Sequence, residues 1–331
     1  MKRWVVGFMA LVCCAAVAQA VDIDLVPVGN PGNANDTTGY GGVGYTYGIG
    51  KFEVTAGQYT AFLNKVGGVD TYSLYNTGMS NTSYGSGIAR SGGGTVANPY
   101  TYSVATDFTN RPVNYVSFWD ACRFANWLNN GQQGAGTTEY GAYSLNGVTY
   151  PNNSSITRNA GWQWAVTSED EWYKAAYYDP ATGTYFDYPT SSNTAPGRDM
   201  ADPLPGNNAN YYTGSGAYPI DSGKYTTVAG EFQNSDSPYG TFDQGGNVFE
   251  WNEAILYGSE RGLRGGSFYG DGGNFYGVAN LRAAGRDGND LLGESFAIGF
   301  RVSEVPEPVT MAGMVLGIGG MVGYIRRRMA R

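Results

Sequence analysis

The stretch that decides the fold is Gly245-Gly-Asn-Val-Phe-Glu-Trp251, which is followed by Arg264-Gly-Gly-Ser-Phe268. Glycine pairs let backbone segments approach closely and adopt left-handed turns. Phe268 and Trp251 have the size and shape of core residues. Short apolar segments separated by glycine pairs predict short strands joined by tight turns.

Three helix starts are visible upstream of this stretch. Thr55-Ala-Gly-Gln58 forms a capping box, with apolar residues following at helical spacing. Ser117 with Asp120, and Ser168 with Glu171, repeat the pattern before apolar stripes. We therefore predict helices that begin directly after Thr55, Ser117 and Ser168.

The remaining segments are poor in helical periodicity. Residues 21–50 alternate polar and apolar positions and predict strands and turns. Residues 67–108 are rich in Gly, Ser, Thr and Asn, which predicts a long surface excursion. About 60 residues beyond Asp179 show little regular pattern. The predicted class is α+β, with few helices, short antiparallel strands and long ordered loops.

Composition excludes several classes of function. The 331 residues carry a net charge of −8 and include 51 Gly, 27 Tyr and 7 Trp. So acidic a chain repels phosphate backbones, which argues against a nucleic-acid partner. The aromatic and aliphatic content is too high for a disordered chain.

Histidine is absent from the sequence, and cysteine occurs only at positions 13, 14 and 122. The lack of histidine excludes Ser-His-Asp and Cys-His catalysis and histidine-ligated metals. Cys122 lies on the second predicted helix, where we expect a small buried hydrophobe. Without a second cysteine in the domain, neither a disulfide nor a two-cysteine redox site is possible there.

The two ends of the chain are expected to serve export. Residues 1–20 combine Lys2 and Arg3, an apolar run and an Ala18-Gln19-Ala20 cleavage motif, as in a secretory signal peptide. Residues 309–325 are apolar and precede an arginine cluster. Such a run spans about 25 Å as a helix, enough for a thin bilayer, with the arginines on the cytoplasmic side. We assign residues 21–304 to the domain between them.

Six motifs, in order, resemble those of the formylglycine-generating enzyme (sulfatase-modifying factor) family. They correspond to the family's E-V-T-x-x-Q-Y, P-V-x-x-V-S-W-x-D-A, P-T-E-A-E-W, G-N-V-W-E-W, R-G-G-S-W and G-F-R patterns. In this sequence they lie at residues 50–59, 111–121, 167–176, 245–251, 264–268 and 299–301. The resemblance implies a Gly-rich α+β domain related to C-type lectins.

The family's reaction uses two copper-binding cysteines to oxidise a substrate cysteine to formylglycine. The resemblance places those positions at about Val278 and Ala283, neither of which can bind copper or form a thiolate. Cys122 lies on a distant predicted helix and cannot substitute for the pair. We therefore expect no copper and no formylglycine chemistry.

The resemblance also implies two structural calcium sites. Calcium prefers carboxylate and carbonyl oxygens, so bound ions would tie long loops. The second site maps to Asp243 (asparagine in the family), Gly246, Val248 and Glu250; an ordinary buried ion-pair acid is the alternative for Glu250. The first site maps less directly to Asn210, Tyr211 and Asp221.

Four arginines allow two interpretations. They can pair with carboxylates in a loop-rich interior, or contact a ligand. These are Arg264, Arg282, Arg286 and Arg301.

The tail from Val305-Pro-Glu-Pro308 onward resembles the PEP-CTERM sorting signal of Gram-negative bacteria. That resemblance implies an exosortase-type protease as partner and a final position at the cell surface, in the outer membrane or in the extracellular matrix. A plain C-terminal membrane anchor is the alternative.

Three functions follow as hypotheses. The leading one is a non-catalytic surface or matrix module that binds extracellular polysaccharide or protein. The second is an enzyme of different chemistry on the same scaffold, using acids near the vacated cleft. A purely structural matrix component is the third. The acids considered for the second are Asp271, Asp287, Asp290 and Glu294.

Overall fold

The computed structural model describes residues 20–148, 156–214, 219–269 and 277–305. Four α-helices and twelve short strands are assigned within these ranges. The helices are α1 (Ala56–Val66), α2 (Phe118–Asn129), α3 (Glu169–Tyr177) and α4 (Gly277–Asn280). The strands are β1 (Leu25–Val28), β2 (Tyr47–Gly50), β3 (Ile88–Ser91), β4 (Thr101–Val104), β5 (Trp164–Val166), β6 (Tyr178–Asp179), β7 (Thr184–Tyr185), β8 (Phe249–Leu256), β9 (Glu260–Arg264), β10 (Asp287–Asn289), β11 (Ile298–Phe300) and β12 (Val302–Glu304).

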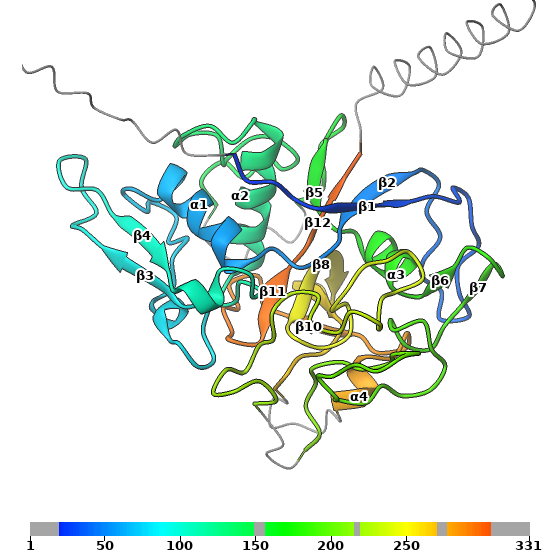
Figure 1. Cartoon of the computed structure of the whole chain (residues 1–331). Helices are drawn as coiled ribbons and strands as arrows, with labels where there is room; N and C mark the ends of the chain where they lie inside the picture. Colours follow the sequence, from blue (N-terminus) through cyan, green and yellow to red (C-terminus); the bar gives the residue numbers. More distant parts are fainter. Residues whose placement is uncertain (1–19, 149–155, 215–218, 270–276, 306–331) are drawn as a thin grey trace, which may run out of the picture.

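Two four-stranded sheets form the centre of the molecule. The first has the order β1-β2-β12-β5, so the first and last strands of the domain share one sheet (Figure 1). The second has the order β10-β9-β8-β11. Its β11 pairs parallel with β8, whereas the other pairs in both sheets are antiparallel. The predicted α+β class with few helices and short strands is confirmed.

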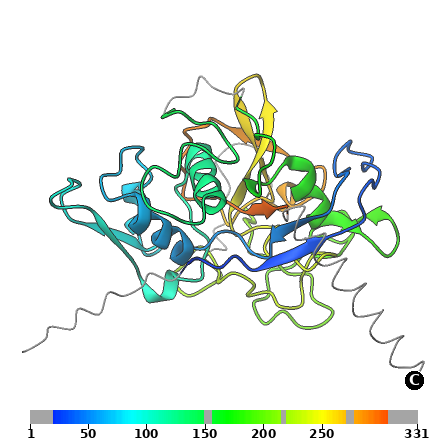
Figure 2. The same ribbon diagram turned by 90° about the horizontal axis from the view of Figure 1, so that it is seen from above.

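The long helices lie on opposite sides of these strands. Figures 1 and 2 show α1 and α2 on one side and α3 on the other. The main core lies on the α1 and α2 side, where Phe124 of α2 packs edge-on against Phe300 of β11. Trp251 of β8 packs edge-on against Phe118 at the start of α2.

All three predicted capping boxes are present. The side chains of Thr55, Ser117 and Ser168 each accept a hydrogen bond from the third residue of the following helix. In each case that residue's side chain bonds back to the cap. These reciprocal bonds satisfy N–H groups that a helix start otherwise leaves unpaired. The sequence therefore predicted where α1, α2 and α3 begin.

The prediction for residues 67–108 was wrong in part. The segment contains the β3–β4 hairpin and two 3-10 turns, at Thr77–Ser80 and Thr106–Phe108. The hairpin lies at the outer edge of the molecule (Figure 1). Large side chains from the segment are nevertheless fully buried in the main core, among them Met79 and Ile88. Isolated apolar residues between glycines and serines hide this contribution in the sequence.

Several expectations fall outside the described residues. These are the signal peptide up to residue 19, the sorting or anchor segment from residue 306 onward, and Asp271. Within the ranges that the structure covers, no helix has the length and apolar character needed to cross a bilayer.

Candidate functional site

A buried ion pair joins the motif at residues 245–251 to the motif at residues 299–301. Glu250 of β8 and Arg301, which lies between β11 and β12, are both fully buried. Arg301 Nε donates to Glu250 Oε2 over 2.5 Å, and its second terminal nitrogen donates to Oε1 over 2.7 Å. Trp172 Nε1 of α3 also donates to Oε2, over 2.8 Å. Glu250 is therefore a paired acid, as the alternative interpretation of this residue proposed.

Glu53 adds a second buried carboxylate next to this pair. It is 1% exposed, and neither carboxylate oxygen has a hydrogen-bond partner among the described residues. Burial, reinforced by the charges of Asp243 and Glu250, raises the pKa of Glu53 well above its usual value. An unsatisfied buried carboxylate is costly unless a proton or a cation neutralises it. Glu53 is thus a candidate ligand that the sequence analysis missed.

The backbone brings Asp243 to the same place. Phe242 N donates to Lys51 O over 2.9 Å, and the rings of Phe52 and Phe242 lie 5.7 Å apart. Asp243 accepts a hydrogen bond from Gly230 N through Oδ2, over 2.6 Å. Burial raises the pKa of Asp243 to about 6. Two carboxylates that favour neutralisation therefore flank the single charge of Arg301.

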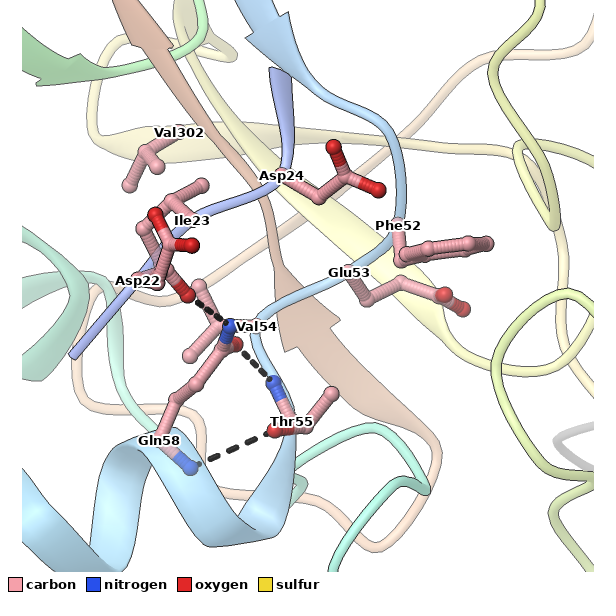
Figure 3. Close-up of a pocket in the computed structure, with 9 residues that line it drawn as sticks. All are labelled: Asp22, Ile23, Asp24, Phe52, Glu53, Val54, Thr55, Gln58 and Val302. Atoms are coloured by element: carbon pink, nitrogen blue, oxygen red, sulfur yellow. Dashed lines mark hydrogen bonds between the residues drawn. The ribbon is translucent and has the colours of Figure 1, made fainter.

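A small cavity of about 110 Å³ borders Glu53 on the side of the first strand. Its lining includes Asp22, Asp24 and the capping pair Thr55 and Gln58 (Figure 3). Gln58 Nε2 donates to the carbonyl of Asp22, which ties the start of the domain to α1. In Figure 3 the Glu53 side chain extends away from Gln58, in the same direction as Phe52.

The other two residues predicted for this site lie in a tight turn before β8. Gly246 has φ of +93°, and a Cβ there would lie 2.3 Å from the carbonyl oxygen of Asn210. Only glycine fits that position. Val248 is fully buried beside Gly299. The turn thus packs directly against the segment that holds the other predicted site.

The first predicted site also contains unsatisfied buried oxygens. Asn210 is 1% exposed, and its side-chain oxygen has no partner within the described part of the chain. Its amide nitrogen donates to Tyr225 O over 2.8 Å. The hydroxyl of Thr226, the next residue, is likewise buried without a partner there. The side-chain oxygens of Asn210 and Thr226 are therefore two acceptors that a cation could use.

The remaining residues of that site have other partners. Asp221 pairs with Arg111, which also donates to the carbonyl of Thr226. The Tyr211 hydroxyl donates to Pro196 O over 2.7 Å. In the ranges the structure covers, no group of three or more acids or cysteines is placed to hold a metal by side chains alone. A cation here would therefore depend on backbone carbonyls as well.

All four candidate arginines pair with carboxylates, which supports the structural interpretation. Arg264 and Arg286 both bind Glu169, each with a shortest distance of 2.7 Å. Arg264 is fully buried and also donates to the carbonyls of Ala283 and Gly285. Arg282 pairs with Asp187 at 3.5 Å on the surface.

The positions aligned with the family's cysteines are apolar contacts in this structure. Val278 packs against a cluster of Tyr188, Ala209, Tyr211 and Leu281. Ala283 is 5% exposed and belongs to the cluster of Trp172, Tyr173, Ala176 and Tyr177. Cys122 is fully buried on α2, and burial raises the pKa of its thiol well above the usual value. The expected burial of Cys122 is confirmed.

The structure describes three of the four acids considered for a different chemistry. Asp287 opens β10, and Asp290 lies exposed just beyond this strand. Glu294 accepts a hydrogen bond from the Asn76 amide, and burial raises its pKa.

A family model and two solved structures are similar to this chain over most of its length. The profile of the Sulfatase-modifying factor enzyme 1-like domain matches residues 43–305. Treponema denticola variable protein 1 is similar in structure, with a TM-score of 0.54 and 17% identity, over 88% of this chain and 98% of that chain. CarF is similar with a TM-score of 0.51 and 20% identity, over 86% of this chain and 99% of that chain. No curated protein matches the chain.

Proposed function

Because the chain belongs to the Sulfatase-modifying factor enzyme 1-like family over residues 43–305, we propose that it is a non-catalytic member that acts as an exported binding module. Its ligand would be an extracellular polysaccharide or a surface protein. The observation that carries this proposal is the chemistry of Val278 and Ala283. Both positions offer only apolar side chains, and they contact two separate clusters.

Residues 1–20 and the tail from Val305 onward support export and sorting. A signal peptide and a PEP-CTERM-like segment would place the domain at the cell surface or in the matrix, with an exosortase-type protease as processing partner. The proposed module is therefore outward-facing in either reading of the tail, sorted or anchored.

Structural calcium is part of this proposal. The unsatisfied oxygens of Glu53 and Asn210 fit a hard cation, since they are buried acceptors without a donor within the described residues. Glu53 and Asp243, with the carbonyls of Gly246 and Val248, would hold the second ion beside Glu250. Asn210 and Thr226 would contribute to the first. Bound calcium would supply positive charge to the loops and no reaction step.

The test combines an activity assay with a binding screen on the full chain. Incubation with a cysteine-containing peptide, copper and oxygen should yield no aldehyde. A panel of immobilised polysaccharides and surface proteins, probed in millimolar calcium and again with chelator, should retain the chain on at least one member. Aldehyde formation would overturn the non-catalytic assignment. Failure to bind any member would overturn the binding module and favour a purely structural role.

A further inference from the structure

A second cavity, of about 300 Å³, opens on the other face of the β10-β9-β8-β11 sheet. Leu263 of β9 lies opposite both Trp251 of β8 and Asp287 of β10. Residues that lie opposite each other in a ladder point to the same face. The cavity therefore opens on the face that carries Leu263 and Asp287, and Glu250 lies on the reverse face.

The floor of this cavity is apolar and its rim is polar or aromatic. Phe249, Leu263 and Ile298 form a buried floor. Asp287, Asn289 and Ser295 line the rim and are each partly exposed. Apolar walls with a few convergent polar groups are typical of small-molecule sites.

Aromatic rings extend the rim into a half-exposed platform centred on Phe296. The Phe296 ring contacts the rings of Tyr269, Tyr84 and Tyr115 at centroid distances of 4.7, 5.6 and 6.3 Å. Tyr84 is 40% exposed, and the other three rings are partly exposed. Such rings normally lie in cores, so a cluster left open to solvent indicates a contact surface.

The backbone of Tyr115 holds its ring in this cluster. Tyr115 has φ of +58°, a conformation that is unfavourable for a bulky side chain. Its N–H donates to Ser295 O over 2.9 Å, which fixes the ring beside Phe296. Unfavourable backbone geometry that is retained by surrounding contacts is frequent at ligand sites.

The charge of the cavity selects among possible ligands. None of its ten described lining residues is Lys or Arg, and Asp287 is its charged member. An anionic polysaccharide would find no cation to pair with there. A neutral pyranose with equatorial substituents and linkages presents flat C–H faces to aromatic rings, and its hydroxyl groups reach carboxylate and amide oxygens. This is the chemistry that Phe296, Tyr269, Asp287 and Asn289 offer together.

We propose that the Tyr269–Phe296 platform and the adjoining cavity bind a neutral, equatorially linked polysaccharide. This assignment rests on the proposed binding function and names its site and ligand class. Tyr269 and Tyr84 would stack on successive sugar rings, and Asp287 and Asn289 would accept or donate hydrogen bonds to hydroxyl groups.

The experiment is calorimetric titration of the full chain with cellohexaose, with a hyaluronan oligosaccharide as the anionic comparison. We expect cellohexaose to bind and hyaluronan not to bind. Tyr269→Ala and Tyr84→Ala should each weaken the affinity for cellohexaose by about tenfold. Tyr140→Ala is the matched control, because Tyr140 is 59% exposed and bonds Asn146 in the loop after α2.

The outcomes separate the site, the ligand and the function. Equal cellohexaose affinity in wild type, Tyr269→Ala and Tyr84→Ala overturns the site. Retention of other polysaccharides or proteins without cellohexaose binding overturns the ligand class and leaves the binding module intact. Absence of binding to cellohexaose and to every other polysaccharide or protein overturns the ligand class and the binding module together. Circular dichroism of each variant identifies any loss of affinity that is due to unfolding, and Tyr84→Ala, at a partly exposed position, then decides.

Discussion

The two faces of the β10-β9-β8-β11 sheet use their side chains in opposite ways. On the α3 face, Glu250 and Arg264 are fully buried, and each charge has a partner of opposite sign. The other face is divided, because Trp251 and Leu263 are buried in the main core whereas Asp287 and Asn289 line an open cavity. One face thus holds the fold together through paired charges. The other combines core side chains with a polar and aromatic rim around a cavity.

The charged face should respond most strongly to mutation. Arg301→Met would leave Glu250, Glu53 and Asp243 buried without their cation. Breaking a buried ion pair from one side costs about 3–5 kcal/mol, so we expect a large fall in the urea midpoint. Adding Glu250→Gln to this variant should restore part of the loss, since one unpaired charge disappears.

The surface pair Arg282–Asp187 is the control for that prediction. Both side chains are 51% exposed, so Arg282→Ala should change the free energy of unfolding by less than about 1 kcal/mol. Similar losses in Arg301→Met and Arg282→Ala would contradict the importance assigned to the buried pair.

The second largest effect is expected from calcium, which would stabilise the protein beside the buried charges. An ion bound to the native state at 100 times its dissociation constant adds about 2.7 kcal/mol of stability. The melting temperature should therefore fall when chelator replaces calcium, and Glu53→Gln should reduce that difference. The measurement is differential scanning calorimetry with and without calcium. An unchanged melting temperature in chelator would sink the calcium assignment.

A pH titration sharpens the comparison, because helix α2, on the side of Trp251, carries an acid that forms no salt bridge with the residues that the structure describes. Asp120 caps the helix through Ser117, and burial, followed by the charge of Glu294, raises its pKa to about 7. The unfolded chain has the lower pKa, so the native state binds the proton more tightly. Protonation of Asp120 therefore stabilises the protein as the pH falls from about 7 towards 4. Above pH 7 its contribution to the free energy of unfolding no longer changes.

The variant Asp120→Asn isolates that contribution. Between pH 5 and 6 the wild-type free energy of unfolding should rise by up to about 1.4 kcal/mol more per unit of acidification than that of the variant. Urea unfolding at a series of pH values measures the difference. Parallel curves for the two proteins would show that Asp120 titrates normally.

The cavity rim on the open face should be the least sensitive in stability. Asn289→Ala removes one side-chain bond, from Asp290 N, at a partly exposed position. We expect the free energy of unfolding, measured by urea denaturation, to change by less than about 1 kcal/mol. A loss comparable to that of Arg301→Met would mean that the cavity rim is structural, contrary to the contrast between the faces.

The helix starts and the fold class could be predicted because their causes are local or repeated. A capping box such as Thr55 to Gln58 lies within four residues of sequence. The parallel pairing of β11 with β8 could not be predicted, because the two strands are far apart in the sequence and β11 is only three residues long, which specifies the register weakly.

The acids that lie around Arg301 could not all be named from the sequence, for a similar reason. Glu250 lies in the motif at residues 245–251 and Asp243 lies two residues before it, but nothing in the residues around Glu53 shows that it is buried beside them. These segments are brought together by contacts of the folded chain, among them Phe242 N to Lys51 O and Val54 N to Phe300 O. The core contribution of residues 67–108 was missed because Ile88 and Met79 find their partners only in the folded chain.

The position of β12 has a consequence for the order in which the domain can be made. This strand pairs with β2 on one side and β5 on the other, and Arg301 just before it binds the carbonyl of Gly50. The first sheet therefore stays divided until the last residues of the domain have been synthesised. The early segments therefore cannot complete this sheet without the final strand of the domain.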